Sequence, residues 1–323
     1  MKKFISLLLL PAMLLGIFAL FSCNDDAPLK LGLGVTTTVS ASNATEKKAG
    51  QGQAITTVAA VLVNEKGKIV RAFLDCAENK VDYTAEGKAI KVDSFKTKYE
   101  LKESYGMKNA GATKEWYQQA DAFCKVVKGK TVDKVKALVA SDQRGTKEVL
   151  NAGCTIAVSD FVKAIENAVA NAAESSATKK STLKLTAVTS QTASDATNEK
   201  AGSNKLSTTF FAAAVDSQGK IVAANSDCVE SDFTFDINGK STFDTTKAVV
   251  SKKQLGNDYG MKAAGAAKEW FEQAAAFDAA CIGKTASEVS TLEGNDGKGN
   301  ADVQAAGCTI YVSDFVKAAA KIG

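Results

Sequence analysis

Histidine is absent from this chain of 323 residues. Ser-His-Asp and Cys-His catalytic sites, His-ligated haem and most zinc sites need an imidazole, so the sequence excludes these classes. No Cys-x-x-Cys motif occurs either, which leaves a thioredoxin-like centre and c-type haem attachment without support. Carboxylates are plentiful, but no pair of them stands apart from a solvated background. We therefore expect a protein that is not an enzyme.

Proline and arginine are scarce. The only prolines are Pro11 and Pro28, so no polyproline spacer divides the chain, and the only arginines are Arg71 and Arg144. Nearly all positive charge is lysine, which is the poorer residue for bidentate recognition of phosphates and bases. The formal net charge is only +4, whereas nucleic-acid-binding proteins carry strongly basic surfaces. We expect no nucleic-acid partner.

The N-terminal segment has the pattern of a lipoprotein signal. Lys2 and Lys3 precede an apolar run over residues 4–21, and residues 20–23 read Leu-Phe-Ser-Cys, which is a lipobox. The apolar run is short and contains a proline, which disfavours a membrane-spanning anchor. We predict a cleaved signal peptide over residues 1–22.

Lipidation at Cys23 would attach the mature protein to a membrane. Acylation of the new N-terminus adds more than one chain, and two or more chains give stable anchoring. Residues 23–30 are then a lipidated stalk, and the lipid membrane is a partner through acylated Cys23. We expect the mature protein on the extracytoplasmic face of a bacterial membrane or on the cell surface.

After the leader, the chain contains one stretch twice. Residues 105–123 and 259–277 are identical at fourteen of nineteen positions, which indicates an internal repeat. We predict two homologous domains, over residues 31–171 and 183–323. A polar segment that is poor in apolar residues, 172–182, is predicted to link them.

The repeated stretch predicts a helix. Its Tyr-Gly-Met-Lys lead-in is followed by good helix formers, and Trp116, Ala120 and Phe123 recur at helical spacing as the expected core stripe. The lead-in also suggests a helix N-terminus whose free N–H groups, with a glycine and a lysine, would suit a phosphate.

The order of patterns within each domain predicts the fold class. Two β-branched runs flank a polar loop that ends in glycine, at residues 64–67 and 216–219, which is typical of a hairpin. Helical patterns follow, and the last segment is predicted as a short strand leading into a helix capped by Ser159 or Ser313. We expect an α+β protein of two tandem homologous domains, each an antiparallel, hairpin-rich sheet packed with helices.

Three cysteines lie in each domain. Two positions correspond between the domains, and the third is offset by three residues, which is close to one helical turn. Outside the cytoplasm a disulfide in each domain, a thiol redox centre or small buried apolar side chains all remain open. The six are Cys76, Cys124, Cys154, Cys228, Cys281 and Cys308.

The most informative segment lies near the end of each domain. It reads Asp-Val-Gln-Ala-Ala-Gly-Cys-Thr at residues 302–309 and Glu-Val-Leu-Asn-Ala-Gly-Cys-Thr at residues 148–155. This segment resembles the FMN-binding domain family, whose attachment motif reads Asp-Gly-x-x-Ser/Thr-Gly-Ala-Thr. The early hairpin and the helix directly after the threonine are similar to that family as well. The chain departs from the motif where it has Val, Ala and Cys.

The resemblance implies a cofactor and its attachment points. Carried over residue by residue, it implies that Thr155 and Thr309 bear FMN covalently, each as an ester with the FMN phosphate. Gly153 and Gly307 would let the backbone approach the cofactor, and Asp302 would be recognised by a flavin transferase.

Aromatic and thioether side chains of the repeated lead-in are candidate walls for the flavin ring. They are Tyr105, Met107, Tyr259 and Met261. A lipid-anchored chain with two such domains is similar to flavin-carrying lipoproteins of extracellular electron transfer, which implies a membrane electron donor. We expect an anchored lipoprotein that carries FMN and relays electrons. The alternative is a surface-binding or structural lipoprotein of the same fold without cofactor.

Overall fold

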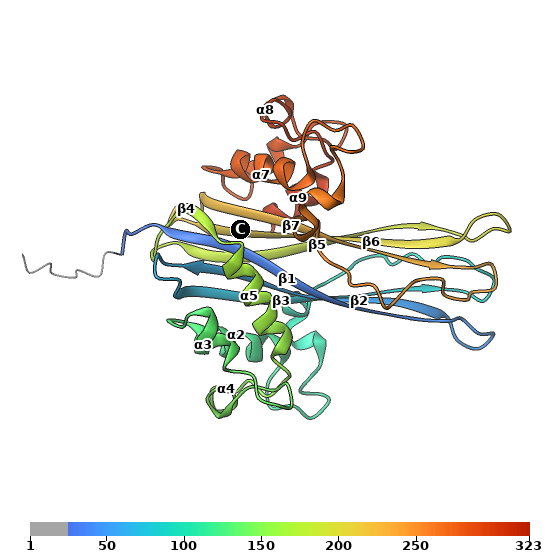
Figure 1. The fold of residues 1–323 in the computed structure, drawn as a ribbon, viewed down its shortest axis with the longest axis horizontal. Helices are drawn as coiled ribbons and strands as arrows, with labels where there is room; N and C mark the ends of the chain where they lie inside the picture. Colours follow the sequence, from blue (N-terminus) through green and yellow to red (C-terminus); the bar gives the residue numbers. More distant parts are fainter. Residues whose placement is uncertain (1–24) are drawn as a thin grey trace, which may run out of the picture.

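The computed structural model describes residues 25–323 (Figure 1). The predicted signal peptide over residues 1–22 and the lipobox residue Cys23 lie outside this range. The described part of the predicted stalk leads directly into the first strand, which begins at Leu29. Among the described residues no helix is both long and apolar enough to cross a membrane.

Two antiparallel sheets form the middle of the molecule. Their strand orders are β3-β2-β1-β4 and β5-β6-β7. The strands are β1 (Leu29–Ser42), β2 (Gly50–Val63), β3 (Ile69–Tyr83), β4 (Ala173–Ala177), β5 (Thr182–Ser194), β6 (Gly202–Val215) and β7 (Ile221–Phe235). The predicted hairpins are confirmed, because Gly67 joins β2 to β3 and Gly219 joins β6 to β7, with φ of +67° and +77°.

Helices follow each set of strands, so the predicted α+β class is confirmed. The first group is α1 (Lys98–Leu101), η1 (Lys102–Tyr105), α2 (Trp116–Val127), α3 (Val132–Lys136), α4 (Lys147–Ala152) and α5 (Ser159–Ala170). The second group is α6 (Lys252–Leu255), η2 (Gly256–Tyr259), α7 (Trp270–Cys281), η3 (Glu288–Leu292), α8 (Ala301–Ala305) and α9 (Ser313–Ala320). We call β1–β3 with the first group unit one, and β5–β7 with the second group unit two.

The predicted apolar stripe of the repeated helix is confirmed, but its start is not. Trp116, Ala120 and Phe123 are buried in the core of unit one. The helix begins only at Trp116, because Gly106 and Gly111 adopt left-handed φ of +80° and +89° and keep the lead-in in turns.

The predicted caps of the late helices are wrong. Ser159 and Ser313 are the first helical residues, and neither the residue before them nor their own side chains cap the helix. The Ser313 hydroxyl instead donates to the carboxylate of Glu293 and lies 3.4 Å from the carbonyl oxygen of Gly297, which ties a loop to the helix start. The preceding segments form only isolated bridges and no strand.

The molecule has four layers (Figure 1). The two sheets lie face to face, and one helical group covers part of the outer face of each sheet. An apolar cluster joins the sheets, with Leu33 and Leu62 from unit one against Leu185, Phe210 and Ala212 from unit two. Each sheet therefore packs one face against its own helices and the opposite face against the sheet of the other unit.

The segment predicted as a linker contributes to this packing. It contains β4, which pairs with β1 through Leu31 and Ala173. At the far end of the sheets the ring of Tyr83 stacks on Phe235, with centroids 4.3 Å apart and planes 7° from parallel. The two units are thus in contact along the whole length of the strands.

Candidate functional site

A buried glutamate closes each Tyr-Gly-Met-Lys turn. The two carboxylate oxygens of Glu115 accept hydrogen bonds from the backbone N–H groups of Met107 at 2.8 Å and Lys108 at 3.2 Å. Glu269 makes the same bonds in unit two, at 2.9 and 3.2 Å. These N–H groups are not free, and a carboxylate would repel a phosphate. The prediction of a phosphate site at this turn is therefore wrong.

A buried glutamine holds each threonine of the Gly-Cys-Thr segments. In unit one the backbone N–H and the hydroxyl of Thr155 both donate to Oε1 of Gln119, at 2.8 and 3.1 Å. In unit two Thr309 donates in the same way to Gln273, at 2.8 and 3.0 Å. The glutamines are buried, whereas the threonines are exposed. Each hydroxyl is thus fixed in orientation on an exposed residue.

A lysine side chain packs directly against the glycine of the same turn. Gly153 and Gly307 have φ of +94° and +99°. A Cβ at these positions would lie 2.0 Å from Nζ of Lys114 and 2.1 Å from Nζ of Lys268. Each ammonium donates to the carbonyl of the residue before the glycine, at 3.3 and 3.0 Å. Because glycine has no Cβ, the lysine side chain fits at this position and places a positive charge beside the turn that carries the threonine.

Sequence reasoning missed these glutamines and lysines. Both belong to a Lys-Glu-Trp-x-x-Gln segment that recurs at residues 114–119 and 268–273. The signal was therefore visible as a repeat, but only the fold shows that this segment packs on the Gly-Cys-Thr turn.

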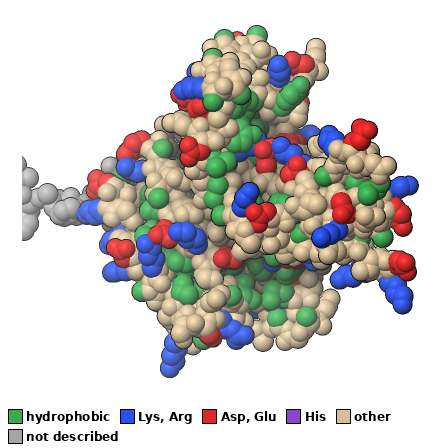
Figure 2. All heavy atoms as spheres, turned by 45° about the vertical axis from the view of Figure 1, so that its right-hand side comes forward, with side chains coloured by type: hydrophobic (Ala, Val, Ile, Leu, Met, Phe, Trp, Pro, Cys, Tyr) green, Lys and Arg blue, Asp and Glu red, His purple; other side chains and the backbone are tan. Residues whose placement is uncertain are grey.

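Unit two contains a cavity of about 620 Å³ between its helices and β5–β7. Its volume lies within the range of small-molecule sites. Figure 2 shows hydrophobic side chains gathered in the furrow between a helical lobe and the strands. The apolar wall of the cavity is formed by Tyr259, Met261, Trp270, Ile310 and Phe315.

The candidate threonine lies next to this cavity. Thr309 directly precedes Ile310 of the wall, and Nε2 of the glutamine that holds it, Gln273, lies 3.8 Å from Sδ of Met261. Asp302, by contrast, lies exposed on α8 and outside the cavity lining. The structure thus brings Thr309 and Met261 together and leaves Asp302 apart.

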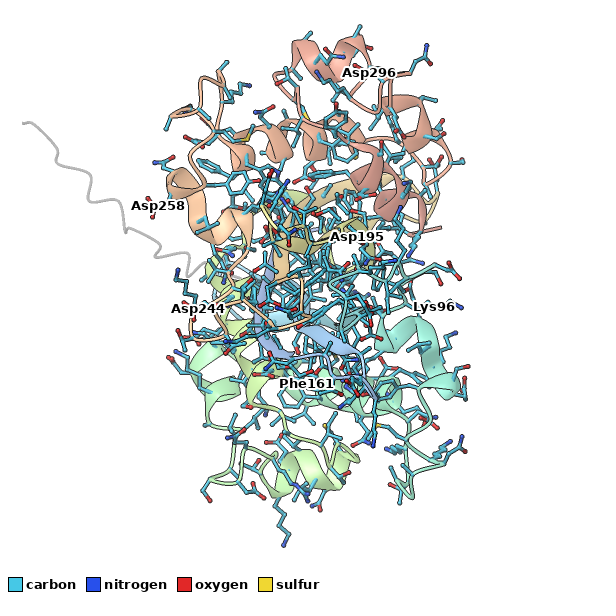
Figure 3. The ribbon with its side chains drawn as sticks, turned by 90° about the vertical axis from the view of Figure 1, so that its right-hand side faces the viewer. Lys96, Phe161, Asp195, Asp244, Asp258 and Asp296 are labelled. Atoms are coloured by element: carbon cyan, nitrogen blue, oxygen red, sulfur yellow. The ribbon has the colours of Figure 1, made fainter. Side chains whose placement is uncertain are left out.

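The corresponding residues of unit one make the same contacts around a smaller cavity. The Tyr105 hydroxyl donates to Glu78 at 3.2 Å, and Glu78, Lys98 and Tyr105 line a cavity of about 280 Å³. Tyr105 and Met107 lie against the helical core of that unit, together with Ile55. Phe161, the counterpart of the cavity residue Phe315, lies inside the same helical layer (Figure 3).

A charge pair forms the polar end of the cavity. Nζ of Lys252 lies 3.1 Å from Oε1 of Glu230 and 4.9 Å from the ring centroid of Tyr259. The Tyr259 hydroxyl donates to the other Glu230 oxygen at 3.3 Å. Burial alone would raise the pKa of Glu230, but the ammonium groups of Lys252 and Lys205 together outweigh it and hold that pKa below its ordinary value. Glu230 is therefore charged at neutral pH.

The thiols are weakly acidic, and all but the half-buried Cys124 are buried. All six cysteines in the described range are free of disulfides. Burial raises the pKa of Cys228 to about 12, and that of Cys154 and Cys308 to about 11. Because the thiolate is the reactive form, these groups are poor nucleophiles at neutral pH. The geometry favours their role as small core side chains over a thiol redox centre.

No protein-family model, curated protein or solved structure matches this chain. Within residues 25–323, no group of three or more His, Cys, Asp or Glu side chains could hold a metal ion. The threonine, its glutamine and lysine, and the neighbouring cavity form the candidate site.

Proposed function

We propose that this protein is a membrane-anchored extracytoplasmic lipoprotein that carries FMN and relays electrons. The observation that supports this best is the pair of hydroxyls of the exposed residues Thr155 and Thr309, each oriented by a buried glutamine. These are the hydroxyls at which the resemblance to FMN-binding domains places the cofactor.

The surrounding residues fit a phosphate group attached to threonine. A phosphodiester carries a negative charge, and Lys114 or Lys268 supplies a positive charge beside the turn. Once the hydroxyl is esterified it no longer donates, but Oε1 of Gln119 or Gln273 keeps the hydrogen bond from the backbone N–H of the threonine. The turn therefore stays in place after modification.

Attachment by a transferase is chemically balanced with a flavin dinucleotide as donor. A bond forms between Oγ1 of Thr309 and the phosphorus next to the flavin chain. The pyrophosphate P–O bond breaks, the nucleoside monophosphate leaves, and the hydroxyl proton passes to the transferase or to water. No histidine of this chain takes part, in agreement with its composition.

Bound FMN would supply reversible one- and two-electron chemistry. The contribution of the chain is to position the ring and to exclude water. Tyr259 and Met261 offer a polarisable wall, and the Lys252–Glu230 pair offers a hydrogen-bond donor and an acceptor. On a lipid tether both units would stay close to an electron donor in the membrane.

The test is the intact mass of residues 24–323 co-expressed with a flavin transferase. A mass raised by one or two FMN groups supports the proposal. Thr309→Val and Thr155→Val remove a hydroxyl at nearly constant shape and should each abolish one addition, whereas Thr309→Ser keeps the hydroxyl and should retain it. An unmodified, colourless protein that binds no added FMN would contradict the proposal and favour the cofactor-free surface lipoprotein.

A further inference from the structure

We infer that the cavity of unit two holds the planar ring of the flavin, and that Ser207 and Tyr311 make this unit a tighter ring-binding site than unit one. The inference rests on the proposed function, because it names the flavin as ligand. It adds a difference between two units that share the same threonine site.

Ser207 leaves open a volume that an isoleucine fills in unit one. Ser207 stands opposite Glu230 across β6 and β7, and Ile55 stands opposite Glu78 across β2 and β3, so the two positions are equivalent. The Ser207 hydroxyl donates to Glu230 at 3.2 Å and lines the cavity. Ile55 packs instead against the helical core of its unit.

Tyr311 supplies an aromatic face where unit one has only a methyl group. Tyr311 bridges to Lys298, and the equivalent bridge in unit one joins Ala157 to Arg144. The Tyr311 side chain lines the cavity, yet the residue is 71% exposed. Nζ of Lys298 lies 5.9 Å from its ring centroid. A planar ligand in the cavity would cover this ring and gain a stacking contact.

The rim that carries Tyr311 is held firmly. The Val312 backbone N–H donates to the Gly297 carbonyl at 2.8 Å, and the Ser313 hydroxyl donates to the carboxylate of Glu293 and lies 3.4 Å from the same carbonyl oxygen. Figure 3 shows Asp296 of the same loop in the outer part of the second helical group. In unit one the residue equivalent to Glu293 is Val139, which offers no carboxylate.

The cavity matches the chemistry of an isoalloxazine ring. Tyr259, Trp270 and Tyr311 are aromatic residues of the lining, and Lys252 with Glu230 supplies a donor and an acceptor at one end. The isoalloxazine ring has one apolar edge, which would contact the aromatic residues, and one edge of carbonyl and nitrogen atoms, which would bond to the charge pair. The phosphate is not needed for this contact, so riboflavin alone should bind.

The experiment titrates the full mature, acylated chain in detergent micelles with riboflavin and with FMN. Binding is followed by the quenching of flavin fluorescence that stacking on aromatic rings produces. The wild-type protein should bind riboflavin at one tight site. Tyr311→Ala should weaken this binding about threefold to tenfold, the range of one aromatic stacking contact. Ser207→Ile should abolish it by filling the cavity.

A matched control and a gain-of-function variant complete the design. Ser203→Ile changes a serine on the same strand that also bonds a carboxylate, Asp232, but lies outside the cavity, and should bind riboflavin like the wild type. Ile55→Ser combined with Ala157→Tyr should create a second tight site in unit one. Far-UV circular dichroism checks that each variant is folded.

Three results would overturn the inference. The first is unchanged riboflavin binding in both Ser207→Ile and Tyr311→Ala, and the second is two equal sites in the wild type. The third is that the wild type binds neither riboflavin nor FMN. If Thr309 is nevertheless modified in the co-expression test, the proposed function survives without this ring site.

Discussion

The two units carry the same attachment geometry on differently shaped surroundings. The hydrogen bonds from Thr155 to Gln119 and from Thr309 to Gln273 agree in partner and nearly in length. Beside this repeated arrangement, the cavity of unit two measures about 620 Å³, whereas that of unit one, where Ile55 packs against the core, measures about 280 Å³.

This difference separates two tasks. Holding a threonine hydroxyl requires a buried amide and a turn with a left-handed glycine, and both units provide them. Enclosing a ring requires space and aromatic surface, which depend on other residues. Variants at equivalent positions can therefore test which properties the units share and which belong to one of them.

The largest effect is expected in the core that the two sheets share. Phe210 is fully buried between the sheets, and its counterpart in unit one is Val58. Phe210→Ala should lower the free energy of unfolding by about 3–5 kcal/mol, and Val58→Ala by less because fewer methyl groups are lost. Urea unfolding followed by tryptophan fluorescence measures both.

One tryptophan per unit shows whether the units unfold together. Trp116 reports on unit one and Trp270 on unit two, so Trp→Phe variants at either site leave a single probe. In Phe210→Ala both probes should shift to lower urea together, because neither sheet can cover its inner face alone. A shift of the Trp270 signal alone would show that the units fold independently.

A second effect, of about 2–4 kcal/mol, should be the same in both units. Glu115→Ala and Glu269→Ala each leave two turn N–H groups and a helix start without their buried acceptor. Glu199→Ala in an exposed loop is the control and should stay within about 0.5 kcal/mol. A clearly larger loss in one unit would show that the two turns are not equivalent.

A third prediction concerns the pH dependence of stability, to which Asp75, a buried carboxyl group of unit one, should contribute. Burial raises the pKa of Asp75 from 3.8 to about 6. The folded protein thus binds this proton more tightly than the unfolded chain, and stability should fall as pH rises through about 4 to 6. Asp75→Asn cannot ionise, but its amide oxygen can still accept the N–H groups of Cys76 and Tyr99.

Thermal unfolding at a series of pH values measures this effect. The slope between pH 4 and 6 should become shallower in Asp75→Asn. Burial also raises the pKa of Asp227 and Asp278 in unit two, so part of the slope should remain. Asp142→Asn at an exposed position should leave the profile unchanged. An unaltered slope in Asp75→Asn would contradict the assignment.

Local patterns were sufficient to predict the hairpins, the core stripe and the fold class. Gly67 and Gly219 mark turns because left-handed φ suits glycine, and Trp116 with Phe123 marks a buried face by spacing. The polar starts of the units were not recognised as strands. In β1 and β5 one face bears Ser and Thr, and the opposite face packs against the other unit. The sequence of a single repeat does not reveal this packing.

Only part of the candidate site could be predicted from the sequence, again because the rest depends on contacts between distant segments. Thr309 and Met261 stood out as repeated residues, but their link runs through Gln273, 36 positions before the threonine. The helix was also predicted to begin too early, because only Gly106 was recognised as a break and Gly111 was not. Contacts between distant segments and the choice between equivalent residues, such as Ser207 and Ile55, depend on packing.

The smallest effect on stability is predicted for Tyr311, although this residue is expected to contribute to ligand binding. Tyr311 is mostly exposed, so Tyr311→Ala should change the free energy of unfolding by no more than about 0.5 kcal/mol in urea. Ala157→Tyr, the reverse change in unit one, should be equally neutral. A loss well above that value in Tyr311→Ala would mean that the ring supports the fold of unit two. Neutral stability with weakened riboflavin binding would instead show that an aromatic ring is kept in water at the cavity rim for its ligand.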